Sequence, residues 1–346
     1  MESLTHIQLK QNGEQYRNQF RDVADTIIAE RVKKDNIDWD SLLNQFIYHF
    51  EQTLHLQDPG LITEYMKWAS TYLENRSLSA DIVEEFFTEA KKIYSQTMGD
   101  VIDQVLDKKH LTDSTIRSDF TDAHSSFIHE ENPLFDLAKE YLQCLLNGNR
   151  HSARKLILDA VEQGTDIKDI YMHVFQPCQY EVGRLWQLNQ VNVAQEHFCT
   201  AATQMIMSML YEHIFSTERI NKSIVATTIG GDLHEIGIRM VADFFEIHGW
   251  DTYYLGANIP NQELIDALLE NDADMLALSV TLMSFLSQAQ TLIDEIRTVP
   301  ELDNVKILTG GQPFILESGL WRKVGADGFA INAQKAVETA HTLIPE

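Results

Sequence analysis

Short apolar runs alternate with amphipathic segments in the last part of the chain, and this pattern constrains the fold more than any other feature. We expect the runs, which are rich in β-branched residues, to be strands. They are Ser223–Ile229, Thr252–Leu255, Met275–Thr281, Val305–Thr309 and Gly328–Ala330. Helical patterns such as His234–His248 and Asn261–Asn271 lie between them. Strands that alternate with helices indicate a parallel sheet covered on both faces. We therefore predict an α/β domain, flavodoxin-like or Rossmann-like, with a five-stranded parallel sheet over residues 222–346.

A histidine stands on a glycine-flanked loop directly after the first of these runs. The segment reads Gly231-Asp232-Leu233-His234-Glu235-Ile236-Gly237. An imidazole that leaves the end of a strand is well placed to bind a metal, and a carboxylate two residues earlier can hold it in one tautomer. The alternative is a solvated loop histidine in a plain flavodoxin-like domain. The motif is weak alone, so its weight depends on the residues at the ends of the later strands.

Two further motifs end the third and fourth runs. Forty-one residues lie between Gly237 and Ser279-Val280-Thr281, and 28 residues lie between Thr281 and Gly310-Gly311. In sheets of this kind, ligands lie beyond the carboxyl ends of the strands, and all three motifs fall at those ends. The small residues would let a bulky group pass between strand ends and helices.

Together the three motifs strongly resemble the cobalamin-binding domain shared by methionine synthase, corrinoid methyl carriers and cobalamin photoreceptors. The resemblance extends from about residue 222 to the C-terminus, where Gly325-Ala326-Asp327-Gly328 is similar to the family's ending. It implies that His234 is the lower axial cobalt ligand and that Asp232 is its hydrogen-bond partner. It also implies cofactor contacts, chiefly with the nucleotide tail, from small residues near the strand ends, of which Ser279 would contact either the tail or the Asp–His pair. These are Gly237, Ser279, Thr281, Gly310 and Gly311.

Residues 132–218 precede this domain and read as four helices. They are Leu134–Leu146, Ser152–Gln163, Ile167–Leu188 and Val193–Phe215. Short connections between helices of this length favour an antiparallel four-helix bundle. In the cobalamin family such a bundle stands directly before the sheet domain and covers the upper face of the corrin. The resemblance therefore implies a cobalamin cap over residues 132–218.

Trp186 is followed, after nine residues, by Glu196-His197. This spacing resembles light-sensing, adenosylcobalamin-dependent repressors of the CarH type, and the resemblance implies that these three side chains surround the adenosyl group. The alternative is a capping box at Asn192–Gln195, with Glu196 in a first helical turn and Trp186 in the bundle core. Two departures from the photoreceptor pattern stand out. Gln187 replaces the expected histidine, and no basic helix-turn-helix pattern for DNA binding precedes the bundle.

Residues 1–127 read as helical throughout. Apolar residues at helical spacing occur in Asp40–Phe50, Leu61–Leu73 and Ile82–Tyr94. We predict an all-α domain of about five helices, which resembles globin-like, non-haem sensor modules. A linear tetrapyrrole is one ligand that its histidines could bind, and the alternative is that they lie at the surface or the edge of the core. They are His49, His55 and His110.

Composition narrows the choice of partners. A formal net charge of −25 argues against direct binding to nucleic acid or to an anionic membrane. The three cysteines are too scattered for a disulfide framework, and we expect buried thiols in a reducing compartment. With neither a signal peptide nor an uninterrupted apolar stretch of 20 residues, we predict a cytoplasmic protein.

These observations favour a cobalamin-binding light sensor in signalling. Adenosylcobalamin would lie between bundle and sheet, and light would break the cobalt–carbon bond and change the arrangement of domains or subunits. We expect a homodimer with an unknown output protein, and a sensor rather than an enzyme. The first alternative is a corrinoid methyl carrier that serves a separate methyltransferase, in which case the chemistry is corrinoid-dependent methyl transfer. A mutase subunit is weaker, because the chain has no partner barrel.

Overall fold

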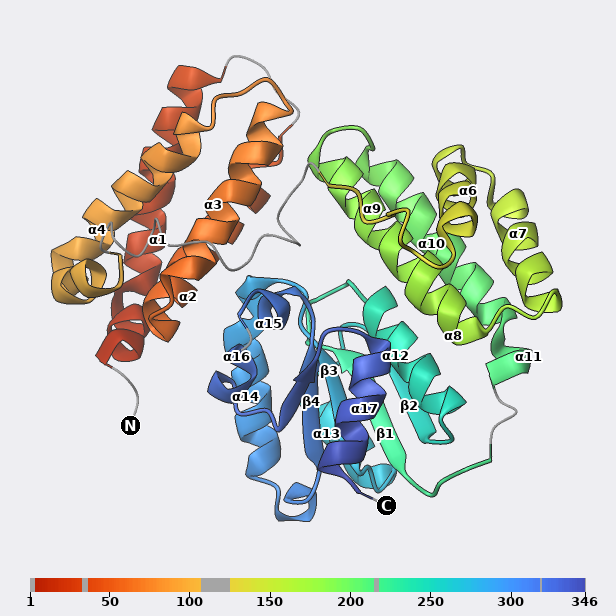
Figure 1. Cartoon of the computed structure of the whole chain (residues 1–346). Helices are drawn as coiled ribbons and strands as arrows, with labels where there is room; N and C mark the ends of the chain where they lie inside the picture. The colour runs from red at the N-terminus through yellow and green to blue at the C-terminus, as the bar shows by residue number, and fades with distance from the viewer. Residues whose placement is uncertain (1–3, 33–36, 107–124, 215–217, 318, 346) are drawn as a thin grey trace. The chain divides into compact units, whose positions relative to one another are not determined.

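The computed structural model describes residues 4–32, 37–106, 125–214, 218–317 and 319–345. The chain divides into two compact units (Figure 1). One comprises Met1–His124 with Gln187–Asn189, and the other comprises Ser125–Trp186 with Gln190–Glu346. Within the described ranges, no helix is both long enough and apolar enough to cross a membrane.

The first unit is helical, as predicted. Its described helices are α1 (Leu4–Arg31), α2 (Trp39–Leu56), α3 (Pro59–Glu74) and α4 (Asp81–Val105). Helices α2 and α3 begin where the carboxylates of Asp38 and Asp58 accept hydrogen bonds from the backbone amides of Ser41 and Gly60. The inner faces of the helices meet in an aromatic core, in which Phe46 of α2 stacks on Phe20 of α1.

The bundle of the second unit agrees with the predicted four helices, except that the third and the fourth are each divided in the structure. The helices are α6 (Phe135–Leu146), α7 (Arg150–Glu162), α8 (Ile167–Ile170), α9 (Gln176–Gln187), α10 (Val193–Met209) and α11 (Tyr211–Ile214). A π-helical turn, η1 (Tyr171–Phe175), joins α8 to α9 within what the sequence predicts as one helix. Both hydrogen bonds of the capping box between Asn192 and Gln195 are present at the start of α10.

The sheet has five parallel strands in the order β2-β1-β3-β4-β5, which confirms the predicted fold class. The strands are β1 (Ser223–Thr228), β2 (Asp251–Gly256), β3 (Met275–Ser279), β4 (Lys306–Gly310) and β5 (Gly328–Ala330). The longer helices between and after them are α12 (Ile236–Ile247), α13 (Asn261–Glu270), α14 (Leu286–Arg297) and α17 (Ala333–Leu343). Short turns complete the domain: η2 (Met283–Phe285), η3 (Pro300–Leu302), α15 (Gln312–Leu316) and α16 (Leu320–Lys323).

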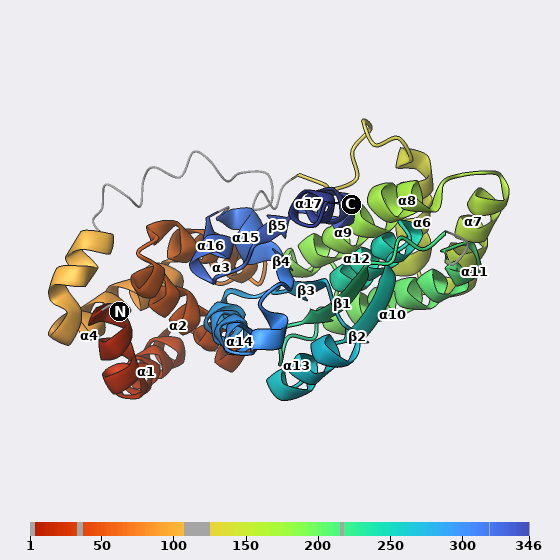
Figure 2. The ribbon, with the colours of Figure 1, turned by 90° about the horizontal axis from the view of Figure 1, so that it is seen from below.

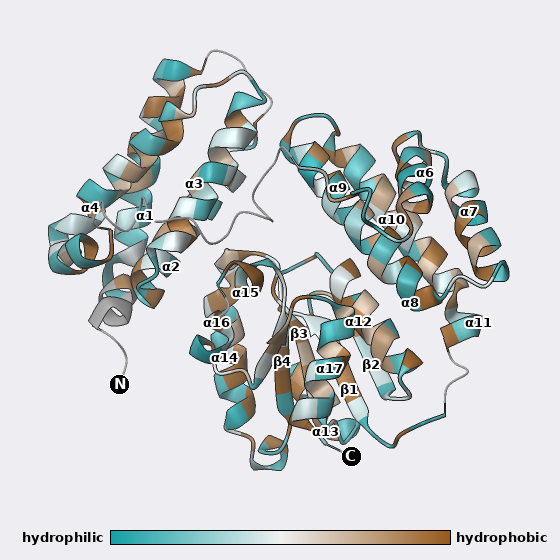
Figure 3. Cartoon of the chain, viewed as in Figure 1, coloured by the Kyte–Doolittle hydropathy of each residue, from teal (hydrophilic) through white to brown (hydrophobic). Residues whose placement is uncertain are grey.

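Helices cover both faces of this sheet. Figure 2 shows α12 and α17 on one side, with α13 and α14 on the other. Each of these helices carries both apolar and polar residues (Figure 3), and its apolar residues recur at helical spacing, so one side is buried. The strand register places Thr228 beside Ser279, Ser279 beside Gly310, and Gly310 beside Ala330. Small residues from four strands therefore form one row across the carboxyl end of the sheet.

The bundle and the sheet domain share a buried polar contact at α12. The Tyr171 hydroxyl donates a hydrogen bond of 2.6 Å to the carboxylate of Asp243, which is buried. Arg239 donates to the hydroxyls of Ser208 and Tyr211. Burial raises the pKa of Asp243 to about 6, although hydrogen bonds from Tyr171 and Tyr211 and the charge of Arg239 oppose the shift. Apolar residues of bundle and sheet surround this contact in one continuous core.

The raised pKa of Asp243 predicts a pH-dependent stability. Because the folded protein holds this proton more tightly than the unfolded chain, the contribution is present at low pH and is lost as pH rises through about 6. Between pH 5 and 7.5 we expect this one group to lower the free energy of unfolding by about 1.4 kcal/mol. Urea unfolding of Asp243→Asn should lack this loss, whereas Asp266→Asn, at an exposed position on α13, should keep it. Equal pH profiles for wild type and Asp243→Asn would contradict this account.

Candidate functional site

The loop after β1 carries the histidine that the sequence singles out. The chain leaves β1 at Thr228 and turns through Gly230-Gly231, with Gly231 at φ +85°. A Cβ atom at Gly231 would lie 3.2 Å from the ring of Phe285, so the turn requires glycine for both conformation and space. This turn buries the carboxylate of Asp232 and leaves the side chain of His234 58% exposed.

Hydrogen bonds from the loop itself and from the ends of β1 and β3 hold Asp232 in place. Its Oδ1 accepts from the backbone amide of His234 at 3.1 Å and from the ring Nδ1 of His234 at 2.8 Å. Its Oδ2 accepts from the backbone amide of Thr281 at 2.7 Å. The Thr228 hydroxyl donates to the Asp232 carbonyl, also at 2.7 Å. The ends of β1 and β3 thus determine the position of the carboxylate, and the carboxylate determines the position of the imidazole.

This arrangement leaves one ring nitrogen available. With Nδ1 donating its hydrogen to Asp232, the neutral imidazole carries its lone pair on Nε2. A histidine oriented through Nδ1 by a carboxylate is typical of metal ligands, because the hydrogen bond selects the tautomer and increases the basicity of Nε2. The Nε2 lone pair of His234 can therefore bind a metal ion that a larger ligand carries.

The pKa values of both His234 and Asp232 are shifted. The hydrogen bond that His234 donates to Asp232 raises the pKa of His234 more than burial lowers it, and the charges of Asp232 and Glu196 add to the rise. Burial works to raise the pKa of Asp232, but hydrogen bonds from His234 and Thr281 outweigh it and lower the pKa. The carboxylate is therefore ionised at neutral pH, as an acceptor of these hydrogen bonds must be.

The predicted small residues fall into two groups. A Cβ atom at Gly237 would meet no other atom within 4 Å, so the space before it is open. Ser279 and Gly310 lie side by side in the row at the sheet's carboxyl end. Gly311 differs, because it has φ +111° and a Cβ there would lie 1.9 Å from the Val280 carbonyl oxygen. Packing within the protein explains that glycine without any ligand.

Three predicted residues come from the bundle. Glu196 lies in the first turn of α10, where its carboxylate accepts a hydrogen bond from Thr200 at 3.2 Å and pairs with the ring of His197. The Glu196 charge raises the pKa of His234, so the start of α10 lies within electrostatic range of the loop after β1. Trp186 is half-buried near the end of α9, and His197 is largely exposed.

Sequence reasoning missed one contributor to the site and the contact that another one makes. It assigned Ser279 a contact with the tail or the Asp–His pair, but the amide two residues later, that of Thr281, binds Asp232. It also overlooked Thr228, whose hydroxyl fixes the loop. A hydroxyl residue at the end of β1, four residues before the aspartate, was the available signal. Backbone amides carry no sequence signal, so the role of Thr281 needed the fold.

The described histidines of the first unit give no indication of a ligand. His49 donates from Nδ1 to the Gln45 carbonyl and stacks on Tyr65, and burial lowers its pKa to about 4. His110 lies outside the described residues. In the described ranges, no group of three or more His, Cys, Asp or Glu residues could hold a metal ion. The predicted linear tetrapyrrole therefore gains no support.

Comparison with known proteins assigns both parts of the second unit. Two family models, each described as a B12 binding domain, match residues 222–340 and 137–211. A corrinoid protein from Desulfitobacterium hafniense is 25% identical over 216 residues, which cover 61% of this chain and 99% of that protein. Dimethylamine corrinoid protein 3 from Methanosarcina mazei is 32% identical over 122 residues, covering 35% of this chain and 71% of that protein.

A solved structure agrees with the fold. The monomethylamine corrinoid protein of Methanosarcina barkeri superimposes with a TM-score of 0.55 at 21% identity, over 61% of this chain and 100% of that one. This similarity supports the arrangement of a helical bundle before a Rossmann-like sheet domain.

The predicted light sensor is wrong. The relatives are corrinoid proteins, two of them named for methylated amines, and none of the three is named a photoreceptor. Trp186 and Glu196-His197 lie inside the segment that matches a B12 binding domain model, so they accompany the bundle without indicating light sensing. Gln187 fits this correction, because glutamine cannot supply the histidine that the photoreceptor pattern requires.

The sequence and the site both indicate a corrinoid ligand. The row of small residues, the open space at Gly237 and the oriented imidazole of His234 all lie within the part of the chain that matches a B12 binding domain. The chain belongs to the family of B12-binding corrinoid proteins.

Proposed function

We propose that this protein is a corrinoid methyl carrier that works with a separate methyltransferase. The observation that carries the proposal is the imidazole of His234, which the buried carboxylate of Asp232 orients through Nδ1 while Nε2 stays open. The relatives named for dimethylamine and monomethylamine support a role with methylated donors. We propose a methyl group, not an adenosyl group, as the upper ligand of the cobalamin.

The residues present fit a corrinoid. Leu233 is 73% exposed beside His234, and such an exposed apolar side chain at a polar loop suits a large ligand with an apolar face. The open space at Gly237 and the row of small residues that includes Ser279 and Gly310 suit the nucleotide tail. When bound, the corrinoid cobalt supplies a centre that accepts a methyl group from one molecule and yields it to another.

The chain's own residues bind and orient. His234 would provide the lower axial nitrogen, and Asp232 would keep the proton on Nδ1 so that Nε2 remains a donor. Thr281, through its backbone amide, and Thr228, through its hydroxyl, keep Asp232 fixed. Since these positions rest on strand ends, the ligand nitrogen lies on a rigid scaffold, which favours precise placement of a metal.

The bundle would cover the other face of the ligand. Glu196, His197 and Trp186 would line this cover, and the Glu196 charge acts toward the same loop as Asp232. The predicted contacts of Thr281 and Gly311 with the cofactor would be made by the backbone around these residues and not by their side chains. The predicted homodimer stays a prediction, and a methyltransferase takes the place of the predicted output protein.

The test is transfer of a labelled methyl group. The cobalamin-loaded protein, reduced with Ti(III), is incubated with ¹⁴C-labelled dimethylamine, monomethylamine or methanol and a soluble extract of the organism that makes it. We expect radioactivity to co-elute with the protein's corrinoid for one donor, and to require both the extract and the bound cobalamin. Protein without cobalamin is the control. A fully loaded protein that acquires no label from any donor would contradict the carrier function.

A further inference from the structure

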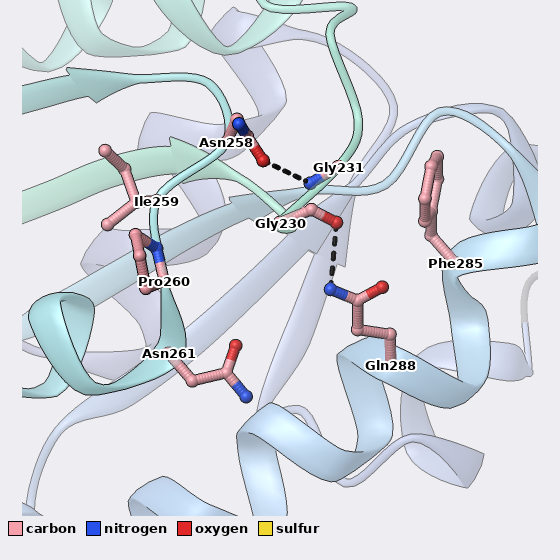
Figure 4. Close-up of a pocket in the computed structure, with 8 residues that line it drawn as sticks. All are labelled: Gly230, Gly231, Asn258, Ile259, Pro260, Asn261, Phe285 and Gln288. Carbon is pink, nitrogen blue, oxygen red and sulfur yellow. Dashed lines mark hydrogen bonds between the residues drawn. The ribbon is translucent and has the colours of Figure 1, made fainter.

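A cavity of about 350 Å³ opens beside the turn that precedes Asp232. Eight residues line it: Gly230, Gly231, Asn258, Ile259, Pro260, Asn261, Phe285 and Gln288 (Figure 4). They come from the loops after β1 and β2, the first residue of α13, the end of η2 and the first turn of α14. Figure 4 shows Phe285 at one side of the cavity and Ile259 with Pro260 at the other, with amide side chains between them. None of these eight side chains is charged.

The backbone fixes the orientation of two of these amides. Asn258 Oδ1 accepts a hydrogen bond from the amide of Gly231 at 3.1 Å, so its Nδ2 is the atom that remains to bind a ligand. Gln288 Nε2 donates to the carbonyl of Gly230 at 2.9 Å, so its Oε1 is the atom that remains to bind a ligand. Among the described residues, neither remaining atom has a hydrogen-bond partner within the protein. The cavity therefore offers one oriented donor, Asn258 Nδ2, and one oriented acceptor, Gln288 Oε1.

A third amide adds a second acceptor. Asn261 donates from Nδ2 to the carboxylate of Glu295 at 2.7 Å, which leaves its Oδ1 for the cavity. Glu295 itself lies outside the lining residues but contributes a negative charge nearby. The cavity thus combines one donor with two acceptors and a negative surrounding. An uncharged primary amide matches this set, because its carbonyl needs a donor and its NH₂ group needs acceptors.

We propose that this cavity binds one primary propionamide arm of the corrin ring and selects corrinoids in which that arm is amidated. The inference rests on the proposed function, since cobalamin carries primary propionamide arms around its ring. Gly231 lies three residues before His234, so their Cα atoms are at most about 11 Å apart. The cavity is therefore within reach of the edge of a ring whose metal His234 binds.

Selectivity follows from the oriented oxygens. A carboxylate in place of the amide has no hydrogen to donate, so its oxygen would face the lone pairs of Gln288 Oε1 and Asn261 Oδ1. The charge of Glu295 would repel it as well. Leaving these acceptors unpaired against an anion costs affinity, and we expect a loss of about 10-fold or more.

Binding of cobalamin and its three propionic monocarboxylates tests the proposal. Titration of the full chain, followed by absorbance, should show at least one monocarboxylate bound about 10-fold more weakly than cobalamin. Gln288→Met removes one of the two acceptors, at an exposed helix position, and should bind cobalamin more weakly and discriminate less between cobalamin and that monocarboxylate. Gln262→Met, at an exposed site on α13 where the amide binds Asp266, should behave as wild type.

The outcomes separate this inference from the proposed function. Equal affinity of the wild type for cobalamin and all three monocarboxylates would overturn it, as would undiminished discrimination in Gln288→Met. In either case cobalamin binding through His234 would still stand. A wild-type protein that binds no corrinoid would overturn the proposed function and this inference together.

Discussion

Replacing His234 with alanine should lower the affinity for cobalamin more than any other single change, by more than about 100-fold. Losing a metal ligand removes a bond, whereas losing a residue that orients a ligand costs about 10–100-fold. The loop should survive, because Asp232 keeps its contact with Thr281 and its carbonyl keeps its contact with Thr228. The cobalamin that still binds should lack a nitrogen ligand from the protein.

Electron paramagnetic resonance of the Co(II) form measures this directly. In wild-type protein labelled with ¹⁵N-histidine, we expect each cobalt line to split into two, where ¹⁴N gives three. His234→Ala should lose this sensitivity to the label. His341→Ala is a matched control, because His341 is exposed in the last turn of α17, which follows β5 and ends away from the strands' carboxyl ends. A label-dependent splitting that persists in His234→Ala would show that another histidine binds the cobalt.

Replacing Asp232 with asparagine should weaken cobalamin binding by about 10–100-fold. An asparagine amide cannot accept at both ends, so its NH₂ group would face either the Thr281 amide or the imidazole. The imidazole would then lose the acceptor that selects its tautomer. Isothermal titration of wild type and variant at pH 8 measures the loss. A variant with wild-type affinity would mean that the Asp232 contact has no part in orienting the ligand.

The same variant should change the pH dependence of binding. Metal binding requires a neutral imidazole, and the Asp232 hydrogen bond raises the pKa of His234. Wild-type affinity should therefore decline as pH falls through this raised pKa, by about 10-fold per pH unit below it. In Asp232→Asn the pKa of His234 falls back, so the acid loss should begin at a lower pH. A variant whose acid loss begins at the same pH or higher would contradict this linkage.

The choice between sensor and carrier illustrates a limit of motif reasoning. The spacing from Trp186 to Glu196-His197 predicted a photoreceptor. The same residues, however, fall within a segment that matches a general B12 binding domain model. Their shared role is to form the start of α10 and the end of α9, where the helix cap at Asn192 also lies. A pattern that shapes a cover for a ligand does not state which group the ligand carries.

The sequence by itself determined the layout of the cobalamin domain. Periodicity assigned the strands and helices, because a buried parallel strand needs a continuous apolar run and a covering helix needs one apolar face. The Asp-x-His spacing likewise identified His234, since residues two apart on a tight loop can form a hydrogen bond without help from the rest of the fold. Only the tertiary structure decided which groups hold Asp232, why Gly311 must be glycine, and where Asn258 meets Gln288 across a cavity. These contacts join segments 27 to 58 residues apart in sequence, and backbone amides make several of them, so no local pattern encodes them.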